Sequence, residues 1–272
     1  MIDASPIDTP MSLIKRTGII ANVSEILAPI ENVPNVYCVG INYLKHYEEG
    51  AKKRGVPLPK EPMVFMKPTT SICGPFDKIV RPSSFFKDVT AVEHADESTN
   101  DQEQLDYEGE LVIVIGHQEA KDLESAKEAM NYVLGVTVGN DITNRFWQRR
   151  NAGSWGFGKG FDGFCPIGPC ITTIQGLKDS YDKETGVLDI ILKTELNGNL
   201  MQHTSTNDFI FSIGEIVQHL SHSRTLLPGT IIMTGTPSGV GYAKKPEPIW
   251  LKPGDTLKTT LEGCGSINNN IV

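Results

Sequence analysis

LDYEGELVIVIG, residues 105–116, and YVLGVTVGNDIT, residues 132–143, decide the fold of this chain. Both runs are rich in Val and Ile, which favour β-strands. Side chains two residues apart on a strand share a face, so Glu108 and Glu110 are expected together where the first run enters a core. An exposed strand end would accommodate these two glutamates alone, but the second run ends on Asp141, a third carboxylate. Crowded carboxylates need a compensating cation or a shared proton, and such hard oxygen ligands suit Mg²⁺, Mn²⁺ or Ca²⁺.

The overall composition is that of an ordinary globular protein. The chain has 272 residues, of which 39% are apolar and 21% charged, enough for one large β domain or a main domain with a small companion. A net charge of −8 argues against nucleic acid or an anionic membrane as a partner. The five scattered cysteines form no CxxC pair, so neither a disulfide framework nor a zinc site is indicated. The N-terminus has no signal or transit character and no apolar run could span a bilayer, which predicts a cytoplasmic protein.

The pattern of elements predicts a mainly β protein with a few helices, of the α+β class. Two helices are expected, one starting at Asp122 and one at Asn207, and the acidic stretch 84–104 is expected to be a surface excursion. The absence of regular βαβ alternation argues against a Rossmann sheet or a TIM barrel. Strands are expected at 36–43, 110–115, 133–139, 188–196, 230–234 and 256–262, and an extended segment at 63–72.

One pair of side chains fits acid–base chemistry. His46 and Glu49 are spaced i, i+3 in a short predicted helix, and a carboxylate that orients an imidazole makes it a better base. Such pairs also occur by chance on many helices, so this signal is weak alone. His219 and His222 have the same spacing but no acidic or histidine partner nearby, and are interpreted as residues of a helix surface.

Further polar residues follow the predicted strands in glycine-rich segments. Lys159 lies between two glycines, where it could stabilise a developing negative charge, or else be a solvated loop lysine. Arg145 and Gln148 follow Asp141, and an arginine there could clamp a carboxylate. Thr236 lies in a Gly/Pro/Ser/Thr loop whose amides and hydroxyl could hold a substrate carboxylate. This loop lacks the Lys-Ser/Thr of a nucleotide P-loop.

Eight motifs in order over about residues 35–272 resemble one known family. They are VYCVGINYLKH-x-x-E, EPMVFMKP, LDYEGELVIVIG, GVTVGNDIT-x-R-x-WQ, GKGFDGFCPIGP, LNGNLMQHTSTNDFIF, LLPGTIIMTGTPSGVG and LKPGDTL. The chain resembles the fumarylacetoacetate hydrolase family, in the branch of acylpyruvases, oxaloacetate decarboxylases and oxaloacetate tautomerases. This resemblance implies a β-roll or sandwich, usually a homodimer. It also implies an N-terminal region with a lid helix, residues 1–66, before a catalytic domain, residues 67–272.

The resemblance also implies roles for the residues reached above. Three of them match the family's divalent-metal ligands, for Mg²⁺ or else Mn²⁺ or Ca²⁺: Glu108, Glu110 and Asp141. Three match catalytic positions, namely the lid dyad His46 and Glu49 and the lysine Lys159. Gln148 and Thr236 fall in substrate- and metal-proximal segments, and Arg145 keeps its expected role as a substrate-binding residue that clamps a carboxylate. The chain departs from many members at Ile41, where they have an arginine, which leaves the substrate open.

The expected function is therefore a metal-dependent reaction of a small β-dicarbonyl or β-keto acid through an enolate held by the metal. The expected reactions are C–C bond hydrolysis of an acylpyruvate-type substrate or decarboxylation of oxaloacetate. Oxaloacetate keto–enol tautomerisation is an alternative, as is a biosynthetic reaction on a larger keto-enol compound. A catalytically silent binding protein is a further alternative, although such a protein would be free to lose the three carboxylates and the dyad.

Overall fold

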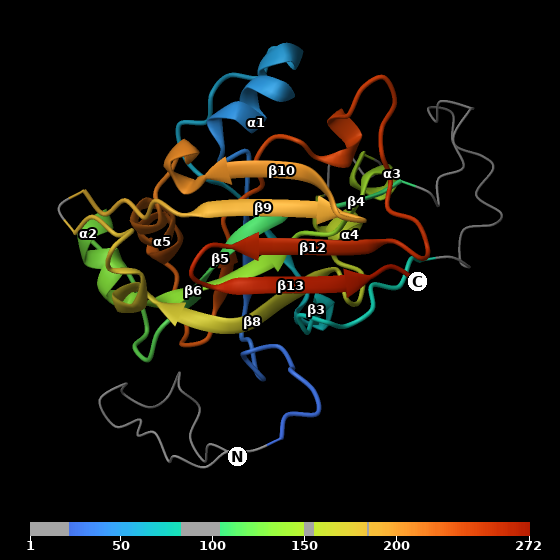
Figure 1. The fold of residues 1–272 in the computed structure, drawn as a ribbon. Helices are drawn as coiled ribbons and strands as arrows, with labels where there is room; N and C mark the ends of the chain where they lie inside the picture. The colour runs from blue at the N-terminus through green and yellow to red at the C-terminus, as the bar shows by residue number, and fades with distance from the viewer. Residues whose placement is uncertain (1–21, 83–103, 150–154, 184) are drawn as a thin grey trace.

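Two β-sheets packed face to face form the core of the protein (Figure 1). The computed structural model describes residues 22–82, 104–149, 155–183 and 185–272. The larger sheet has seven strands in the order β2 (Met63–Lys67), β1 (Val36–Gly40), β11 (Ile231–Met233), β5 (Gly109–Ile115), β6 (Val133–Asn140), β8 (Cys165–Thr173) and β3 (Ile72–Cys73). The smaller sheet has four, in the order β10 (Asn199–Ser205), β9 (Ile191–Leu196), β12 (Thr256–Leu261) and β13 (Gly265–Asn270). A short pair, β4 (Leu105–Asp106) and β7 (Thr143–Asn144), lies beside the point where β5 begins.

The helices of the described residues are short and lie around the sheets (Figure 1). They are α1 (Leu44–Glu49), α2 (Ala126–Ala129), α3 (Arg145–Arg149), α4 (Trp155–Lys159) and α5 (Ile213–Ser221). Single 3-10 turns occur at Lys52–Arg54, Thr69–Ser71, Met130–Tyr132, Ile174–Leu177, Thr206–Asp208 and Gly241–Ala243. None of these helices is long and apolar enough to cross a membrane. The mainly β fold with a few helices is thus confirmed.

Strand β5 is the centre of the core, because it is buried on both of its faces. Leu111 and Ile113 pack into one apolar cluster with side chains of the smaller sheet, while Val112 and Val114 pack into a second cluster on the opposite face. A strand covered on both sides reads as a continuous apolar run, which is why the segment from residue 111 to 115 carries no polar residue. Its neighbour β6 is antiparallel, so the start of β5 lies beside the end of β6.

The pairing of the strands excludes a doubly wound sheet among the residues that the structure describes. Only β1–β11 and β3–β8 are parallel pairs, and the remaining strand pairs are antiparallel. Strands β1 and β2 belong to the seven-stranded sheet, and the expected boundary between residues 66 and 67 falls inside β2. Strands on both sides of that boundary therefore share one sheet.

The predicted strands occur, with ends that differ from the prediction by at most three residues, but both predicted helix starts are wrong. Asp122 has a left-handed backbone with φ 49° and caps no helix, because its carboxylate accepts the N–H of Ser223 at 2.6 Å instead. Ser125 is the N-cap of α2. The second helix starts after Ser212, which forms a capping box with Glu215, a stronger start signal than Asn207.

Among the longer strands, β8, β10 and β13 were missed by the sequence analysis. The sequence of β13 is GSINNN, and asparagine has a low intrinsic preference for strands. Only Ile267 and Asn269 of this strand are buried, and its pairing with β12 places it in the sheet. The acidic stretch 84–104 lies, except for its last residue, outside the described residues.

Candidate active site

The buried charged side chains of the described residues all gather at one place, beside the start of β5 and the end of β6. Each of them forms an ion pair or a potential metal ligand with another member of the group. The members are the carboxylates Asp106, Glu108, Glu110 and Asp141 and the cations Lys67, Arg145 and Lys159. Since isolated buried charges are costly, such a convergence indicates a site rather than a packing accident.

The three predicted metal ligands are brought together. Glu108, Glu110 and Asp141 each offer an oxygen within 4.8 Å of the others. The antiparallel pairing of Gly109 with Asn140 makes this possible, and a main-chain hydrogen bond of 2.7 Å from Asp141 N to Glu108 O continues it. A set of three carboxylate oxygens at this spacing is a donor set that suits a hard divalent cation.

Lys159, at the end of α4, is buried inside the cluster and is not a solvated loop lysine. Its Nζ lies 2.7 Å from Glu108 Oε2, 2.6 Å from Asp141 Oδ2 and 2.8 Å from Thr143 Oγ1. Burial alone would lower the pKa of Lys159, but the carboxylates of Asp141 and Glu108 outweigh it and raise this pKa. The lysine is therefore charged, and all three of its hydrogens have protein acceptors.

Lys67, at the end of β2, is a member of the cluster that the sequence analysis missed. Its Nζ lies 2.5 Å from Asp141 Oδ1 and donates to Phe164 O at 2.7 Å. The residue stands in the motif EPMVFMKP, and a lysine that ends an apolar strand was the only available signal. Its contact with Asp141 spans 74 residues of sequence, a separation that no local pattern reveals.

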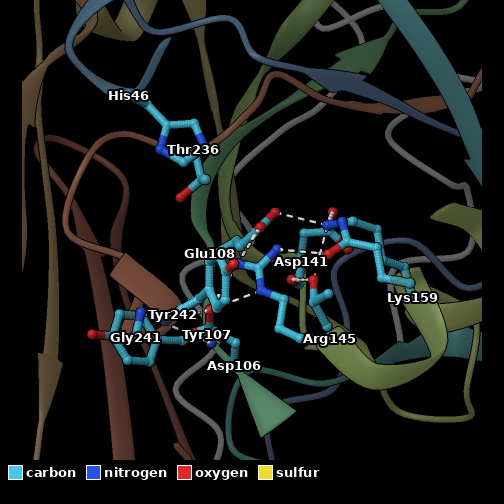
Figure 2. Close-up of polar contacts among 12 residues, drawn as sticks. His46, Asp106, Tyr107, Glu108, Asp141, Arg145, Lys159, Thr236, Gly241 and Tyr242 are labelled. Atoms are coloured by element: carbon cyan, nitrogen blue, oxygen red, sulfur yellow. Dashed lines mark hydrogen bonds and ion pairs between the residues drawn. The ribbon is translucent and has the colours of Figure 1, made fainter. Parts of the chain in front are cut away.

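Arg145 turns toward the carboxylates of the protein itself. Its Nε donates to Asp106 Oδ2 at 2.8 Å, and its Nη2 lies 2.7 Å from both Asp106 Oδ2 and Glu108 Oε1. Its Nη1 donates to Gln148 Oε1 at 3.1 Å, so Gln148 is placed beside the same cluster. Asp106, also missed from the sequence, fixes the guanidinium as shown in Figure 2.

The charge balance of the cluster fits a divalent cation. Glu108 pairs with Lys159 and Arg145; burial acts against it, yet these cations lower its pKa to about 2. Glu110 has no ion-pair partner in the part of the chain that the structure describes, and only Gly235 N, at 2.7 Å, is seen to donate to it. Burial first, and then the charges of Asp141 and Glu108, raise the pKa of Glu110 well above its usual range. Four carboxylates against three cations leave one net negative charge, and a bound divalent ion would make the site net positive.

The predicted dyad lies on α1, above the cluster. His46 Nδ1 is 3.4 Å from Glu49 Oε2, and both side chains are largely but not fully buried. Burial alone would raise the pKa of Glu49, but hydrogen bonds from His46 and from the main chain of Gly239 outweigh it and lower this pKa. Figure 2 shows His46 and Thr236 on one side of Glu108 and Asp106 and Tyr107 on the other. A proton gained by His46 would help to lower the pKa of Glu108, which places the imidazole within electrostatic reach of the cluster.

Thr236 lies at the site, but its hydroxyl is held by protein groups. It donates to Gly109 O at 3.1 Å and accepts from Gln202 Nε2 at 2.8 Å. Gln202, on β10, also accepts the N–H of Gly109 at 3.0 Å. The hydroxyl thus ties the loop after β11 to the glycine between Glu108 and Glu110. His219 and His222 lie on and at the end of α5, apart from the acidic cluster.

Comparison with known proteins gives a consistent result. The family model described as fumarylacetoacetate (FAA) hydrolase C-terminal matches residues 35–272. A fumarylacetoacetate hydrolase domain-containing protein 2 homolog of Dictyostelium discoideum is 41% identical over 94% of this chain and 80% of its own. The mitochondrial oxaloacetate tautomerase FAHD2B of Bos taurus is 38% identical over 90% of this chain and 69% of its own. The crystal structure of a 5-carboxymethyl-2-hydroxymuconate delta-isomerase from Mycobacterium smegmatis has a TM-score of 0.69 at 38% identity, over 91% of this chain and 81% of that one.

Proposed function

The chain belongs to the fumarylacetoacetate hydrolase family and is an enzyme of that family, and we propose that it interconverts the keto and enol forms of a small β-keto dicarboxylate such as oxaloacetate. The observation that carries the proposal is the placement of an oriented base, His46 with Glu49, above a buried cluster of three carboxylates. Two similar proteins support this choice of reaction, because one is named an oxaloacetate tautomerase and the other an isomerase. Both names describe proton transfer without loss of atoms.

A divalent cation, Mg²⁺ or else Mn²⁺ or Ca²⁺, is proposed to be held by Glu108, Glu110 and Asp141. When bound, it would polarise the α-keto carboxylate of the substrate and favour the loss of a neighbouring proton. Lys67, Arg145 and Lys159 hold the carboxylates in place and offset their charges. A keto dicarboxylate carries two negative charges, so the net positive site described above is suited to bind it.

The protein residues then move one proton. With a proton on His46 Nδ1 shared with Glu49 Oε2, the other ring nitrogen carries a lone pair. It takes a proton from C3 of the keto form, and a proton is returned to the carbonyl oxygen at C2, which gives the enol with no atom gained or lost. The loop from residue 235 to 241 borders the dyad. Its amides at Gly235, Gly239 and Gly241 donate to protein carboxylates, so the other main-chain amides of the loop are proposed to bind the distal carboxylate.

C–C bond hydrolysis of an acylpyruvate is the second candidate, because the matching family model is that of a hydrolase. The same dyad would take a proton from water, whose oxygen attacks the distal carbonyl, and pyruvate would leave. Decarboxylation of oxaloacetate needs no water and would also give pyruvate. The three reactions thus differ in whether pyruvate appears and from which substrate.

The test is to strip the protein of metal, restore Mg²⁺, and record enol absorbance and pyruvate together. We expect the enol signal of oxaloacetate to relax faster than in buffer with the same Mg²⁺, without pyruvate, and the variant His46→Gln to abolish this. His222→Gln, which changes an exposed histidine at the C-cap of α5, is the matched control. Pyruvate from oxaloacetate would make the enzyme a decarboxylase, and pyruvate from acetylpyruvate a hydrolase. An absence of any Mg²⁺-dependent change with either substrate would overturn the proposal.

We also propose that the enzyme works as a homodimer in the cytoplasm. The similar cattle protein is named as mitochondrial, so cell fractionation with an antibody against this chain is the measurement that decides the compartment. Recovery with the organelle fraction would contradict the cytoplasmic prediction.

A further inference from the structure

One residue of the loop after β11 is held from two opposite sides by main-chain hydrogen bonds. The N–H of Gly239 donates to both carboxylate oxygens of Glu49, at 3.1 and 3.2 Å. The carbonyl oxygen of Gly239 accepts the hydroxyl of Tyr107 at 3.1 Å. Tyr107 directly precedes Glu108 in sequence, so three covalent or hydrogen-bonded steps join the carboxylate cluster to the dyad on α1.

The tyrosine end of this connection is rigid. Tyr107 is fully buried and packs in an apolar cluster with Leu105, Ile142 and Leu257. A ring fixed in this way presents its hydroxyl at a set position. The hydroxyl therefore serves as an anchor that does not depend on α1.

The loop itself has little freedom at Gly239. This residue has φ 100°, and a Cβ placed there would lie 2.3 Å from Met201 O, so only glycine fits. Further along, Asp106 accepts the N–H groups of Gly241 and Tyr242 at 2.8 and 3.0 Å. The two residues before Glu108 thus hold the loop at successive points.

The dyad end, in contrast, is on a short helix of six residues whose N-cap makes no side-chain hydrogen bond. A helix of this length has little stability of its own. Glu49 must nevertheless keep a fixed position if it is to orient His46. The N–H of Gly239 supplies the hydrogen bonds that hold its carboxylate.

We propose that Tyr107 is a positioning residue: by fixing Gly239, its hydroxyl sets the place at which Glu49 docks and thereby the orientation of His46. The proposal rests on the proposed function only in assigning the dyad its role as base. The physical connection from Tyr107 to α1 stands apart from the reaction that the enzyme catalyses.

Hydrogen–deuterium exchange of the full chain tests the connection directly. Tyr107→Phe keeps the ring and removes one hydroxyl; we expect amide exchange to rise roughly three- to tenfold at residues 236–242 and also at 44–50, with β5 and β6 unchanged. The reciprocal variant Glu49→Ala is expected to raise exchange at 236–242. Thr172→Val is the matched control, because it also removes one hydroxyl-to-carbonyl hydrogen bond, to Gly263 O at 3.0 Å, far along the chain. Unchanged exchange at 44–50 in Tyr107→Phe, or an equal rise there in Thr172→Val, would overturn the proposal.

A double-mutant cycle tests the consequence for catalysis. Tyr107→Phe is expected to lower kcat by about three- to tenfold with KM changed by less than about twofold. In the Glu49→Ala background the same substitution is expected to lower kcat by less than about twofold, since the group it positions is gone. Equal losses in both backgrounds would assign Tyr107 a merely structural role and overturn the proposal. If the wild type has no activity on keto acids, the proposed function fails, while the exchange experiment still decides the connection.

Discussion

Glu110 is the residue at which a divalent cation matters most. Lysine or arginine side chains pair with Glu108 and Asp141, whereas the structure gives Glu110 only the N–H of Gly235. Its pKa is raised in the folded protein, by burial first and then by Asp141 and Glu108. Because its folded-state pKa is raised, the contribution of Glu110 to folding stability is fully present below its usual pKa of 4.5. This contribution is lost as the pH rises through the folded-state pKa.

The first prediction follows from the raised pKa of Glu110. At neutral pH and without metal, Glu110→Gln should melt at a higher temperature than the wild type, because it removes the cost of either burying an unpaired charge or keeping this carboxyl protonated. Mg²⁺ at about 100 times its dissociation constant should raise Tm by about 5 °C in the wild type and not in the variant. Differential scanning calorimetry measures both.

The control Glu195→Gln removes a half-exposed carboxylate paired with Lys258 and should leave Tm and the Mg²⁺ effect nearly unchanged. A variant that still gains the full Mg²⁺ effect would contradict this prediction.

The second prediction concerns Glu49, whose lowered pKa keeps it a carboxylate beside His46. Glu49→Gln keeps the shape and the contact with Gly239 but cannot stabilise a charged imidazole. We expect kcat to fall about 10-fold or more with little change in KM. Steady-state kinetics on oxaloacetate enolisation measures it, and an unchanged kcat would remove Glu49 from the mechanism.

Among the elements, the start of β5 depends on a close approach of the two sheets. A Cβ on Gly109 would lie 2.1 Å from Thr194 Oγ1 of β9 and 3.0 Å from Thr259 Cγ2 of β12. The glycine between Glu108 and Glu110 is thus required by packing, and this packing also sets where the two glutamates lie.

The third prediction tests this contact. Gly109→Ala should reduce the free energy of unfolding by about 1–3 kcal/mol, because the added methyl group forces the sheets apart. It should also weaken Mg²⁺ binding, since both neighbouring ligands move. Gly50→Ala is the control, because a Cβ there has ordinary contacts beginning at 3.6 Å. Denaturant titration measures the change in stability, and calorimetry measures Mg²⁺ binding. Equal stability of both variants would contradict the prediction, because it would show that the two sheets accommodate the added methyl group at no cost.

The elements show why part of this structure could be predicted from the sequence and part could not. Strands β5 and β6 were predicted because their Val- and Ile-rich runs report burial directly, and the three carboxylates at their ends came with them. Strand β13 was missed because its asparagines carry no such signal and only pairing with β12 makes it a strand. The dyad was predicted from its helical spacing.

The roles of residues that act through long-range contacts could not be predicted from local sequence patterns. Lys67 reaches Asp141 across 74 residues, and Asp106 reaches Gly241 across 135. The role of Arg145 was open for a similar reason, because nothing in its own segment indicates that Asp106 and Glu108 take up its guanidinium. Spacing predicts which residues share an element, whereas only the fold decides which elements meet.

For the whole molecule, an exposed apolar edge predicts association with a second copy. Strand β2 is an edge of the larger sheet, and Val64 and Met66, on the same face of it, are both exposed. Such edges are normally covered. This is the surface on which we expect the homodimer to form.

The fourth prediction is therefore a mass twice that of the 29.8 kDa chain in light scattering after gel filtration. The double variant Val64→Glu/Met66→Glu should shift the protein toward the monomer, because charges on an edge oppose pairing. Leu200→Glu alters an exposed apolar residue of β10 and should leave the mass unchanged. A monomeric wild type, or a dimer that survives the double variant, would contradict this placement of the interface.

In the proposed reaction, a buried carboxylate cluster with a divalent cation presents a keto acid to the base His46. The most direct measurement is the rate of deuterium incorporation at C3 of oxaloacetate in D₂O, followed by NMR with and without Mg²⁺. We expect Mg²⁺-dependent exchange faster than in buffer for the wild type and for His222→Gln, and loss of this acceleration in His46→Gln and in Glu110→Gln. Exchange no faster than in buffer for the wild type, or exchange retained in His46→Gln, would contradict it.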